Sequence, residues 1–191
     1  PRRRELLQQM GLVFTTLSID IDEQKKEHES PRDFVSRMAL EKARAGWQHR
    51  QRIESLPVLG SDTVVVVDEE IYGKPRDCQH AVDMMTRMSG RFHQVMTAVA
   101  LVHESMQAVE LNCSQVCFLA LIEQDMHAYW QTGEPLDKAG AYAIQGLAAQ
   151  FICDLHGSYS GVMGLPLYET VELLADFGVK CLPVAEKFNK P

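Results

Sequence analysis

The sequence lacks most of the features that define membrane, disulfide-stabilised and zinc-binding proteins. No apolar run is long enough to span a bilayer, and no signal peptide is visible. The five cysteines are an odd number without a CxxC pair, and neither His28 nor His103 has a second histidine four residues on. We therefore expect reduced thiols, no zinc-protease site and a cytoplasmic protein.

Positive charge is also scarce. The chain of 191 residues carries 19 Lys and Arg against 26 Asp and Glu, which gives a formal net charge of −7. This balance argues against a protein that binds nucleic acid through bulk positive charge. Local basic clusters in an acidic protein suit a small anionic ligand better.

Segments with helical and strand patterns alternate along the chain. Because 46% of the residues are hydrophobic and no repeat or long linker is visible, we expect one mixed α/β domain with some antiparallel pairing. Helical patterns cover residues 1–10, 30–48, 77–90, 123–133 and 164–178. Strand patterns cover residues 12–22, 56–75 with an internal break, 93–104, 107–121 and 146–157.

Three consecutive arginines, Arg2, Arg3 and Arg4, follow Pro1 at the start of the first predicted helix. Cations at a helix N-terminus are locally unfavourable, whereas the free backbone N–H groups there attract anions. The segment is therefore either a solvated basic turn or half of an anion site.

Lys42 and Asp62 are polar residues in apolar surroundings. Lys42 continues the apolar stripe of its helix by one turn, so it either extends its ammonium to water or points it into a cleft. Asp62, in LGSDTVVVV, falls between a predicted strand end and the next apolar run. Such a carboxylate is either a turn residue or a general base or metal ligand.

Two further segments combine turns with polar groups. GKPRD places Lys74 and Arg76 before a helix start at Asp77, without the pattern of a P-loop. The glycine-rich loop EPLDKAGAYAIQG carries Gln145, whose amide could read a nucleobase edge or simply be a solvated side chain.

The segment IDIDEQ brings Asp20, Asp22 and Glu23 close together, either as a solvated loop or as part of a site for a hard divalent cation. Basic groups at helix starts, acidic positions and an amide-bearing loop together suit a polyphosphate bound with a divalent ion. Phosphoryl chemistry depends mainly on positioning and charge neutralisation, so no activated Ser or Cys is needed.

The sequence resembles the Maf family over essentially its whole length. The resemblance lies in PRRRELL, EKARA, LGSDTVV, GKPRD, MSGRFHQVMTAVAL, DKAGAYAIQG and GSYSGVMGLPL, in the same order and at similar spacing. It implies an α/β fold with a mixed twisted sheet flanked by helices, two lobes and a central cleft, similar to the inosine-triphosphate pyrophosphatases. Residues 1–191 would form a single Maf-like domain, with an N-terminal strand and the start of the phosphate-binding motif absent from this sequence.

The resemblance implies catalytic roles for three residues. Asp62 matches the proton acceptor that activates the attacking water or holds the metal. Lys42, in EKARA, matches an active-site lysine, and Glu23 matches an acidic site residue. Asp62 and Glu23 are therefore the expected ligands of a divalent cation, Mg²⁺ or Mn²⁺.

Substrate-binding roles are implied in the same way. Arg2 and Arg3 match residues that contact the triphosphate, and Thr63, Lys74 and Gln145 match substrate-recognition positions. SDT, GKPRD and DKAGAYAIQG together are similar to the branch that hydrolyses dTTP and UTP.

Two departures from the family pattern concern these motifs. Ser61 stands where Ala is usual, and Ala148 and Ala149 replace a Gly-Gly after the Gln145 loop. Glycine can adopt backbone angles that are unfavourable for alanine, so the loop that holds Gln145 is expected to lie slightly differently from that of the family. This difference affects the expected substrate preference more than the expected reaction.

The resemblance thus predicts a cytoplasmic nucleoside triphosphate pyrophosphatase that converts dTTP, UTP and modified pyrimidine triphosphates to the monophosphate and pyrophosphate. The expected partner is the nucleotide substrate, with no nucleic acid and no membrane, and the expected assembly is a homodimer. The alternative is a nucleotide-binding regulator of septum formation and cell division without significant hydrolysis.

Overall fold

The computed structural model describes residues 1–49 and 56–181. Its helices and strands follow in chain order: α1 Arg2–Gln9, α2 Pro31–His49, β1 Val58–Val67, β2 Glu70–Tyr72, α3 Cys78–Met88, β3 Phe92–His103, β4 Met106–Phe118, α4 Glu123–Gln131, the short 3₁₀ helices η1 Glu134–Asp137, η2 Ala139–Ala141 and η3 Leu147–Phe151, β5 Ile152–His156, α5 Tyr159–Met163 and α6 Leu167–Asp176.

The strands form one sheet in the order β2-β1-β3-β4-β5. Every pairing among the described strands is antiparallel. The β3–β4 hairpin forms the centre of the sheet, and its residues pair in register from Phe92 opposite Cys117 to His103 opposite Met106. The mixed α/β class predicted from the sequence, a sheet flanked by helices, is confirmed.

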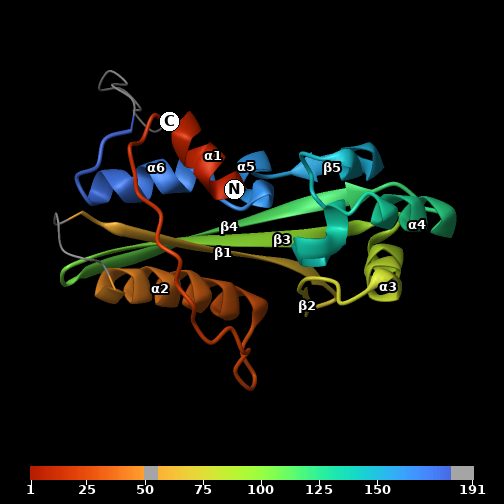
Figure 1. Cartoon of the computed structure of the whole chain (residues 1–191), viewed down its shortest axis with the longest axis horizontal. Helices are drawn as coiled ribbons and strands as arrows, with labels where there is room; N and C mark the ends of the chain where they lie inside the picture. Colours follow the sequence, from red (N-terminus) through yellow and green to blue (C-terminus); the bar gives the residue numbers. More distant parts are fainter. Residues whose placement is uncertain (50–55, 182–191) are drawn as a thin grey trace.

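Helices cover the sheet on both faces (Figure 1). The long helix α2 lies along one face, and α1, α5 and α6 lie on the other, while α3 and α4 gather at one end. Apolar side chains fill the spaces between these layers in three groups, under α2, under α1 and α6, and at the α3–α4 end. Large members that are fully buried include Val35 and Met38 in the first group, Leu101, Leu165 and Leu173 in the second, and Met85, Met88 and Phe118 in the third.

The close approach of α2 to β1 depends on Gly60. A Cβ at this position would overlap the carbonyl oxygen of Ala39 and lie 2.5 Å from the backbone nitrogen of Ala43. Since real Cβ contacts are longer than this, only glycine lets the helix pack so tightly against the strand. This contact sets the position of Lys42, one residue before Ala43, relative to β1.

Most of the predicted elements are confirmed, with boundaries that shift by up to three residues. Ser30 caps the N-terminus of α2, because the Asp33 backbone N–H donates to the Ser30 hydroxyl at 3.2 Å. Pro1 is the N-cap of α1 rather than its first residue, and α3 and α4 begin and end close to the predicted ends. On α6 the buried residues are Thr170, Leu173 and Leu174, whereas Val171 is exposed.

The strand predicted over residues 12–22 is wrong. These residues form an extended segment outside the sheet, which runs along α2. Side chains of Leu17 and Ile19 reach the position of Gly46, and Ile21 packs against the core under α2. Alternation at Leu17, Ile19 and Ile21 therefore reflects a chain that packs against α2 without a strand partner, whereas Val13 is exposed.

Two other strand predictions need correction. The break expected near Asp62 is absent, because β1 runs continuously from Val58 to Val67. The strand expected over residues 146–157 is only half present: η3 occupies Leu147–Phe151 and β5 begins at Ile152. Ala148 and Ala149 lie in this 3₁₀ turn, and neither has a positive φ.

No helix in the described part of the chain is both long enough and apolar enough to cross a membrane.

His93 is a buried polar side chain in the core at the α3–α4 end. Its Nε2 lies 2.8 Å from the Tyr142 hydroxyl, and its ring packs edge-on against Phe118 and Tyr142. Its Nδ1 has no hydrogen-bond partner among the described residues. Burial, with a smaller contribution from the charge of Arg91, lowers the pKa of His93 to about 4.

We expect the free energy of unfolding to fall as the pH drops from about 6.5 to about 4. In this range the unfolded chain binds a proton at His93 that the folded chain does not, and the full difference corresponds to about 3 kcal/mol. The variant His93→Gln should show a flatter dependence in urea unfolding measured from pH 7 to pH 4. The exposed His156→Gln should keep the wild-type dependence. Equal slopes for His93→Gln and the wild type would contradict the assignment.

Candidate active site

The outer edge of β1 gathers the polar residues that the sequence singled out. The short strand β2 pairs only with Val65–Val67, so among the described residues no strand covers the part of β1 before Val65 on that side. Side chains alternate along β1: Asp62 faces α2, and Thr63 faces the opposite layer. This part of β1 therefore has no strand partner on its outer edge and carries polar side chains on both faces.

Lys42 links two carboxylates at this edge. Its ammonium lies 2.7 Å from Asp62 Oδ1 and 2.6 Å from Glu23 Oε1. The side chains of Lys42 and Asp62 are 23% and 14% exposed, while that of Glu23 is 61% exposed. Of the two interpretations of Lys42, the structure therefore favours an ammonium directed into a polar site.

Arg3 reaches the same edge from the opposite face of the sheet. Its Nε donates to the carbonyl of Gly164 at 2.8 Å, and its Nη2 donates to the Thr63 hydroxyl at 3.3 Å. Burial lowers the pKa of Arg3, and the nearby carboxylates of Asp62 and Glu23 act to raise it. The Arg3 guanidinium is thus held in place near the ion pairs that Lys42 forms with Asp62 and Glu23.

Hydroxyl groups behind Arg3 complete this arrangement. Ser61 donates to the Gly164 carbonyl at 3.1 Å, and Thr97 donates to the Gly161 carbonyl at 2.7 Å. The Thr63 and Thr97 hydroxyls lie 2.9 Å apart. Sequence reasoning assigned no role to Thr97 or to the carbonyls of GSYSGVMGLPL, because long-range contacts to backbone carbonyls leave no local pattern. Ser61 differs from the usual Ala in making a specific bond to Gly164.

Arg2 and the loop of residues 133–151 form a second part of the site. Arg2 is partly buried, and burial lowers its pKa while the charges of Asp137 and Glu134 raise it. These interactions place Arg2 near the loop that carries Gln145. Arg2 and Arg3 therefore face different groups, although they are adjacent in sequence.

Gln145, in this loop, and Lys74, close to the loop, are both exposed. The Gly140 N–H donates to the carbonyl of Gly73 at 3.0 Å, which joins the loop to the residue before Lys74. In the part of the chain that the structure describes, neither the Lys74 nor the Gln145 side chain hydrogen bonds with Asp62. The structure thus brings Lys42, Asp62, Glu23, Arg3 and Thr63 together and leaves Lys74 and Gln145 as separate, accessible groups.

Oxygen donors for a metal ion are few. Across residues 1–49 and 56–181, no three His, Cys, Asp or Glu side chains are grouped so that they could hold a metal ion. Asp62 and Glu23 form a pair of carboxylates whose oxygens now contact Lys42. Two hard oxygen donors suit Mg²⁺ or Mn²⁺ when the remaining ligands come from substrate phosphates and water. The pair fits a substrate-associated ion rather than a site formed by protein groups alone.

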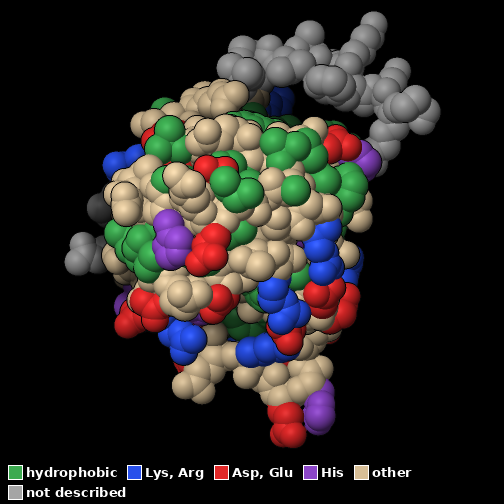
Figure 2. Space-filling model, turned by 90° about the vertical axis from the view of Figure 1, so that its right-hand side faces the viewer, with side chains coloured by type: hydrophobic (Ala, Val, Ile, Leu, Met, Phe, Trp, Pro, Cys, Tyr) green, Lys and Arg blue, Asp and Glu red, His purple; other side chains and the backbone are tan. Residues whose placement is uncertain are grey.

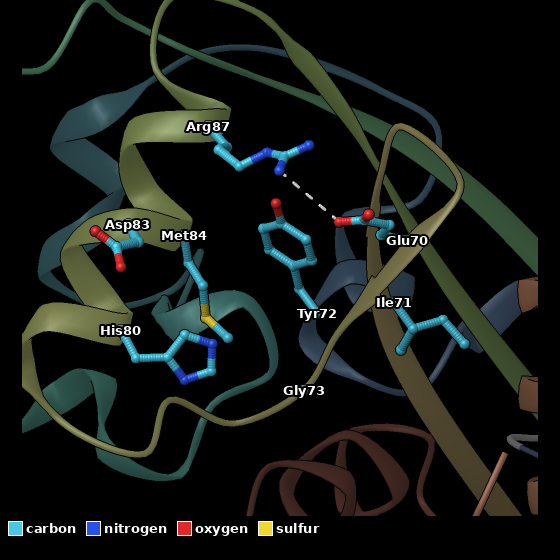
Figure 3. Close-up of a pocket in the computed structure, with 8 residues that line it drawn as sticks. All are labelled: Glu70, Ile71, Tyr72, Gly73, His80, Asp83, Met84 and Arg87. Carbon is cyan, nitrogen blue, oxygen red and sulfur yellow. Dashed lines mark ion pairs between the residues drawn. The ribbon is translucent and has the colours of Figure 1, made fainter.

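A pocket of about 300 Å³ lies between β2 and α3, away from these residues (Figure 3). Tyr72 and Arg87 point toward one another across it, and Arg87 Nη1 lies 3.9 Å from Glu70 Oε2. Gly73 lies at its margin, next to Lys74. The pocket contains none of the predicted catalytic residues.

None of the five cysteines forms a disulfide. Cys113 and Cys117 both lie on β4, and Cys113 is exposed.

The α/β fold thus places an ammonium, a guanidinium and two carboxylates at one strand edge, where the cationic groups can bind and neutralise phosphate oxygens. The chain belongs to the Maf family: the family model described as Maf-like protein matches residues 1–177.

Curated relatives match nearly the whole chain. A protein of Alkalilimnicola ehrlichii named dTTP/UTP pyrophosphatase is 51% identical over 182 residues, which cover 94% of this chain and 90% of that protein. Proteins with the same name from Saccharophagus degradans and Escherichia coli K12 are each 48% identical. The match to the Saccharophagus degradans protein covers 94% of this chain and 86% of that protein. The match to the Escherichia coli K12 protein covers 93% of this chain and 89% of that protein.

Proposed function

We propose that this protein is a nucleoside triphosphate pyrophosphatase that hydrolyses dTTP and UTP to the monophosphate and pyrophosphate. The observation that carries the proposal is the ammonium of Lys42 between Asp62 and Glu23, with Arg3 beside them. Membership of the Maf family and the names of relatives about 50% identical support hydrolysis rather than the alternative of a regulator that only binds nucleotide.

In the proposed reaction, Asp62 takes a proton from a water molecule whose oxygen attacks the α-phosphorus. The bond from that phosphorus to the bridging oxygen breaks, and pyrophosphate leaves with the electron pair. Lys42, Arg2 and Arg3 neutralise the charge that develops on the phosphate oxygens. Lys42 also keeps Asp62 and Glu23 oriented in the absence of substrate.

Asp62 and Glu23 would hold a divalent cation, Mg²⁺ or Mn²⁺, together with the triphosphate. The ion would supply charge neutralisation and an orienting template for the phosphates. Lys42 now contacts one oxygen of each of these two carboxylates, so the ammonium and the ion would bind to the same pair of side chains.

We propose that Arg2, Thr63 and Gln145 set the preference for a pyrimidine base and that Lys74 contributes to substrate recognition. The Gln145 amide is exposed and can both donate to and accept from a base edge. The hydroxyl of Thr63 is engaged by Arg3 and Thr97, so we propose that Thr63 acts by positioning the Arg3 guanidinium.

A nucleic-acid partner is not part of the proposal. Figure 2 shows Lys and Arg side chains lying among Asp and Glu side chains on the face it presents, rather than in a continuous basic surface. At this end of the molecule, Asp68 pairs with Arg91 at 2.5 Å and with Arg87 at 3.5 Å. A cytoplasmic location and a homodimer stay predictions.

A substrate panel tests the proposed function. Pyrophosphate release should be fastest with UTP and dTTP and at least about tenfold slower with GTP and ATP, and it should require added Mg²⁺ or Mn²⁺. Chromatography should identify UMP as the second product of UTP. Tight binding of UTP without UMP formation under either ion would favour the regulator instead, and faster hydrolysis of purine nucleotides would overturn the base preference.

A further inference from the structure

The turn that carries Gln145 is organised around one carboxylate, that of Glu134. The backbone N–H of Leu147 donates to Glu134 Oε2 at 2.9 Å, and that of Ala148 donates to Oε1 at 3.3 Å. The Tyr129 hydroxyl donates to Oε1 at 2.7 Å. Glu134 thus accepts hydrogen bonds from the chain directly after the Gln145 turn.

The chain before Gln145 is tied to the same group of atoms. The Ala143 N–H donates to the hydroxyl of Tyr129 at 3.3 Å, and Tyr129 is buried in the core beneath the loop. Tyr129 and Glu134 therefore hold the backbone two residues before and two residues after Gln145. The Gln145 side chain itself is exposed.

Gly146 shows how closely Glu134 approaches this turn. A Cβ at Gly146 would overlap the carboxylate of Glu134. Since the φ of Gly146 is −109°, a conformation open to any residue, the glycine is needed for space rather than for its backbone angles.

Glu134 is also electrostatically linked to Arg2. Burial acts to raise the pKa of Glu134, but the hydrogen bonds from Tyr129, Leu147 and Ala148 and the charge of Arg2 hold that pKa below its ordinary value. The carboxylate is therefore ionised at neutral pH, and the same interaction acts on Arg2 from the other side.

We propose that Glu134 is a positioning residue for substrate selection, which fixes the backbone on both sides of Gln145 so that its amide meets a pyrimidine base while Arg2 holds the phosphates. The inference rests on the proposed function. Sequence reasoning missed Glu134, because a glutamate before a proline in a loop has no distinctive pattern.

The test uses Glu134→Gln in the full chain. The amide NH₂ of glutamine cannot accept the hydrogen bonds that one carboxylate oxygen now accepts, so the turn loses part of its anchorage at nearly constant volume. We expect KM for UTP to rise about 10- to 100-fold with kcat changed less than about threefold, and the ratio of kcat/KM for UTP over GTP to shrink accordingly. Glu123→Gln, an exposed glutamate on α4, is the matched control and should retain wild-type kinetics.

Two further variants change the contacts of the Glu134 carboxylate without replacing Glu134 itself. Gly146→Ala displaces the carboxylate and should reproduce the loss of selectivity. Tyr129→Phe removes the hydroxyl that donates to Glu134 and accepts from the Ala143 N–H, but it leaves both backbone bonds to Glu134, so a smaller change of about threefold in the same direction is expected. These variants keep the inference testable if Glu134→Gln does not fold.

A double-mutant comparison separates positioning from general stability. If Glu134 acts through Gln145, then Glu134→Gln in a Gln145→Ala background should change the UTP-over-GTP ratio less than about twofold. An equally large effect in both backgrounds, or unchanged selectivity in the folded Glu134→Gln and Gly146→Ala variants, would overturn the inference and leave the proposed function intact. A wild-type protein that releases no pyrophosphate from any nucleotide would remove the proposed function and the inference with it.

Discussion

Replacing Asp62 by asparagine should lower kcat for UTP hydrolysis by about 10²- to 10⁴-fold while the protein stays folded. General-base catalysis typically contributes a factor of this size, and an amide of the same shape cannot take a proton from water. The substitution would also leave Lys42 with Glu23 as its remaining carboxylate partner. Pyrophosphate release under saturating UTP, together with the thermal unfolding midpoint, measures both parts of the expectation.

Asp176→Asn is the matched control for this variant. Asp176 ends α6 and is exposed, so the same chemical change there should leave both activity and stability at wild-type values. A folded Asp62→Asn protein with undiminished kcat would remove Asp62 from its role as base.

The second large effect is expected for Lys42→Met. Methionine is similar in length but carries no charge, so the carboxylates of Asp62 and Glu23 would face each other and the triphosphate without the ammonium. Loss of one electrostatic group of this kind typically costs about 10²- to 10³-fold in rate, and we expect kcat/KM for UTP to fall by a similar factor. Steady-state kinetics over a range of UTP concentrations measures it.

Lys42→Met should also strengthen metal binding while it weakens catalysis. This gain distinguishes the loss of the ammonium charge from a general disruption of the site. With the ammonium gone, the two carboxylates should bind Mn²⁺ more tightly in the absence of nucleotide, which titration calorimetry can detect. Lys25→Met, at an exposed position in the preceding segment, should change neither property. Weaker or unchanged Mn²⁺ binding by Lys42→Met would argue against a shared site for the ion and the ammonium.

Several features follow from the sequence alone, because their signals are local. The capping serine of α2, the Asp77 cap of α3 and the long β3–β4 hairpin follow from periodicity and from turn and cap residues. The family also follows from the sequence, because seven motifs in one order cannot be matched by chance composition. The pairing of Lys42 with Asp62 and Glu23 fits roles that the resemblance had implied.

The remaining features depend on tertiary structure. The alternation over residues 12–22 is the same whether a chain pairs in a sheet or lies along a helix, and here it lies along α2. The short β2 leaves the edge of β1 open at Asp62, which no local pattern encodes. Arg3 and Glu134 are fixed by bonds to Gly164 and Leu147, whose geometry arises only when distant segments pack together. Local preferences specify the elements, whereas the site depends on contacts that exist only after the chain has folded.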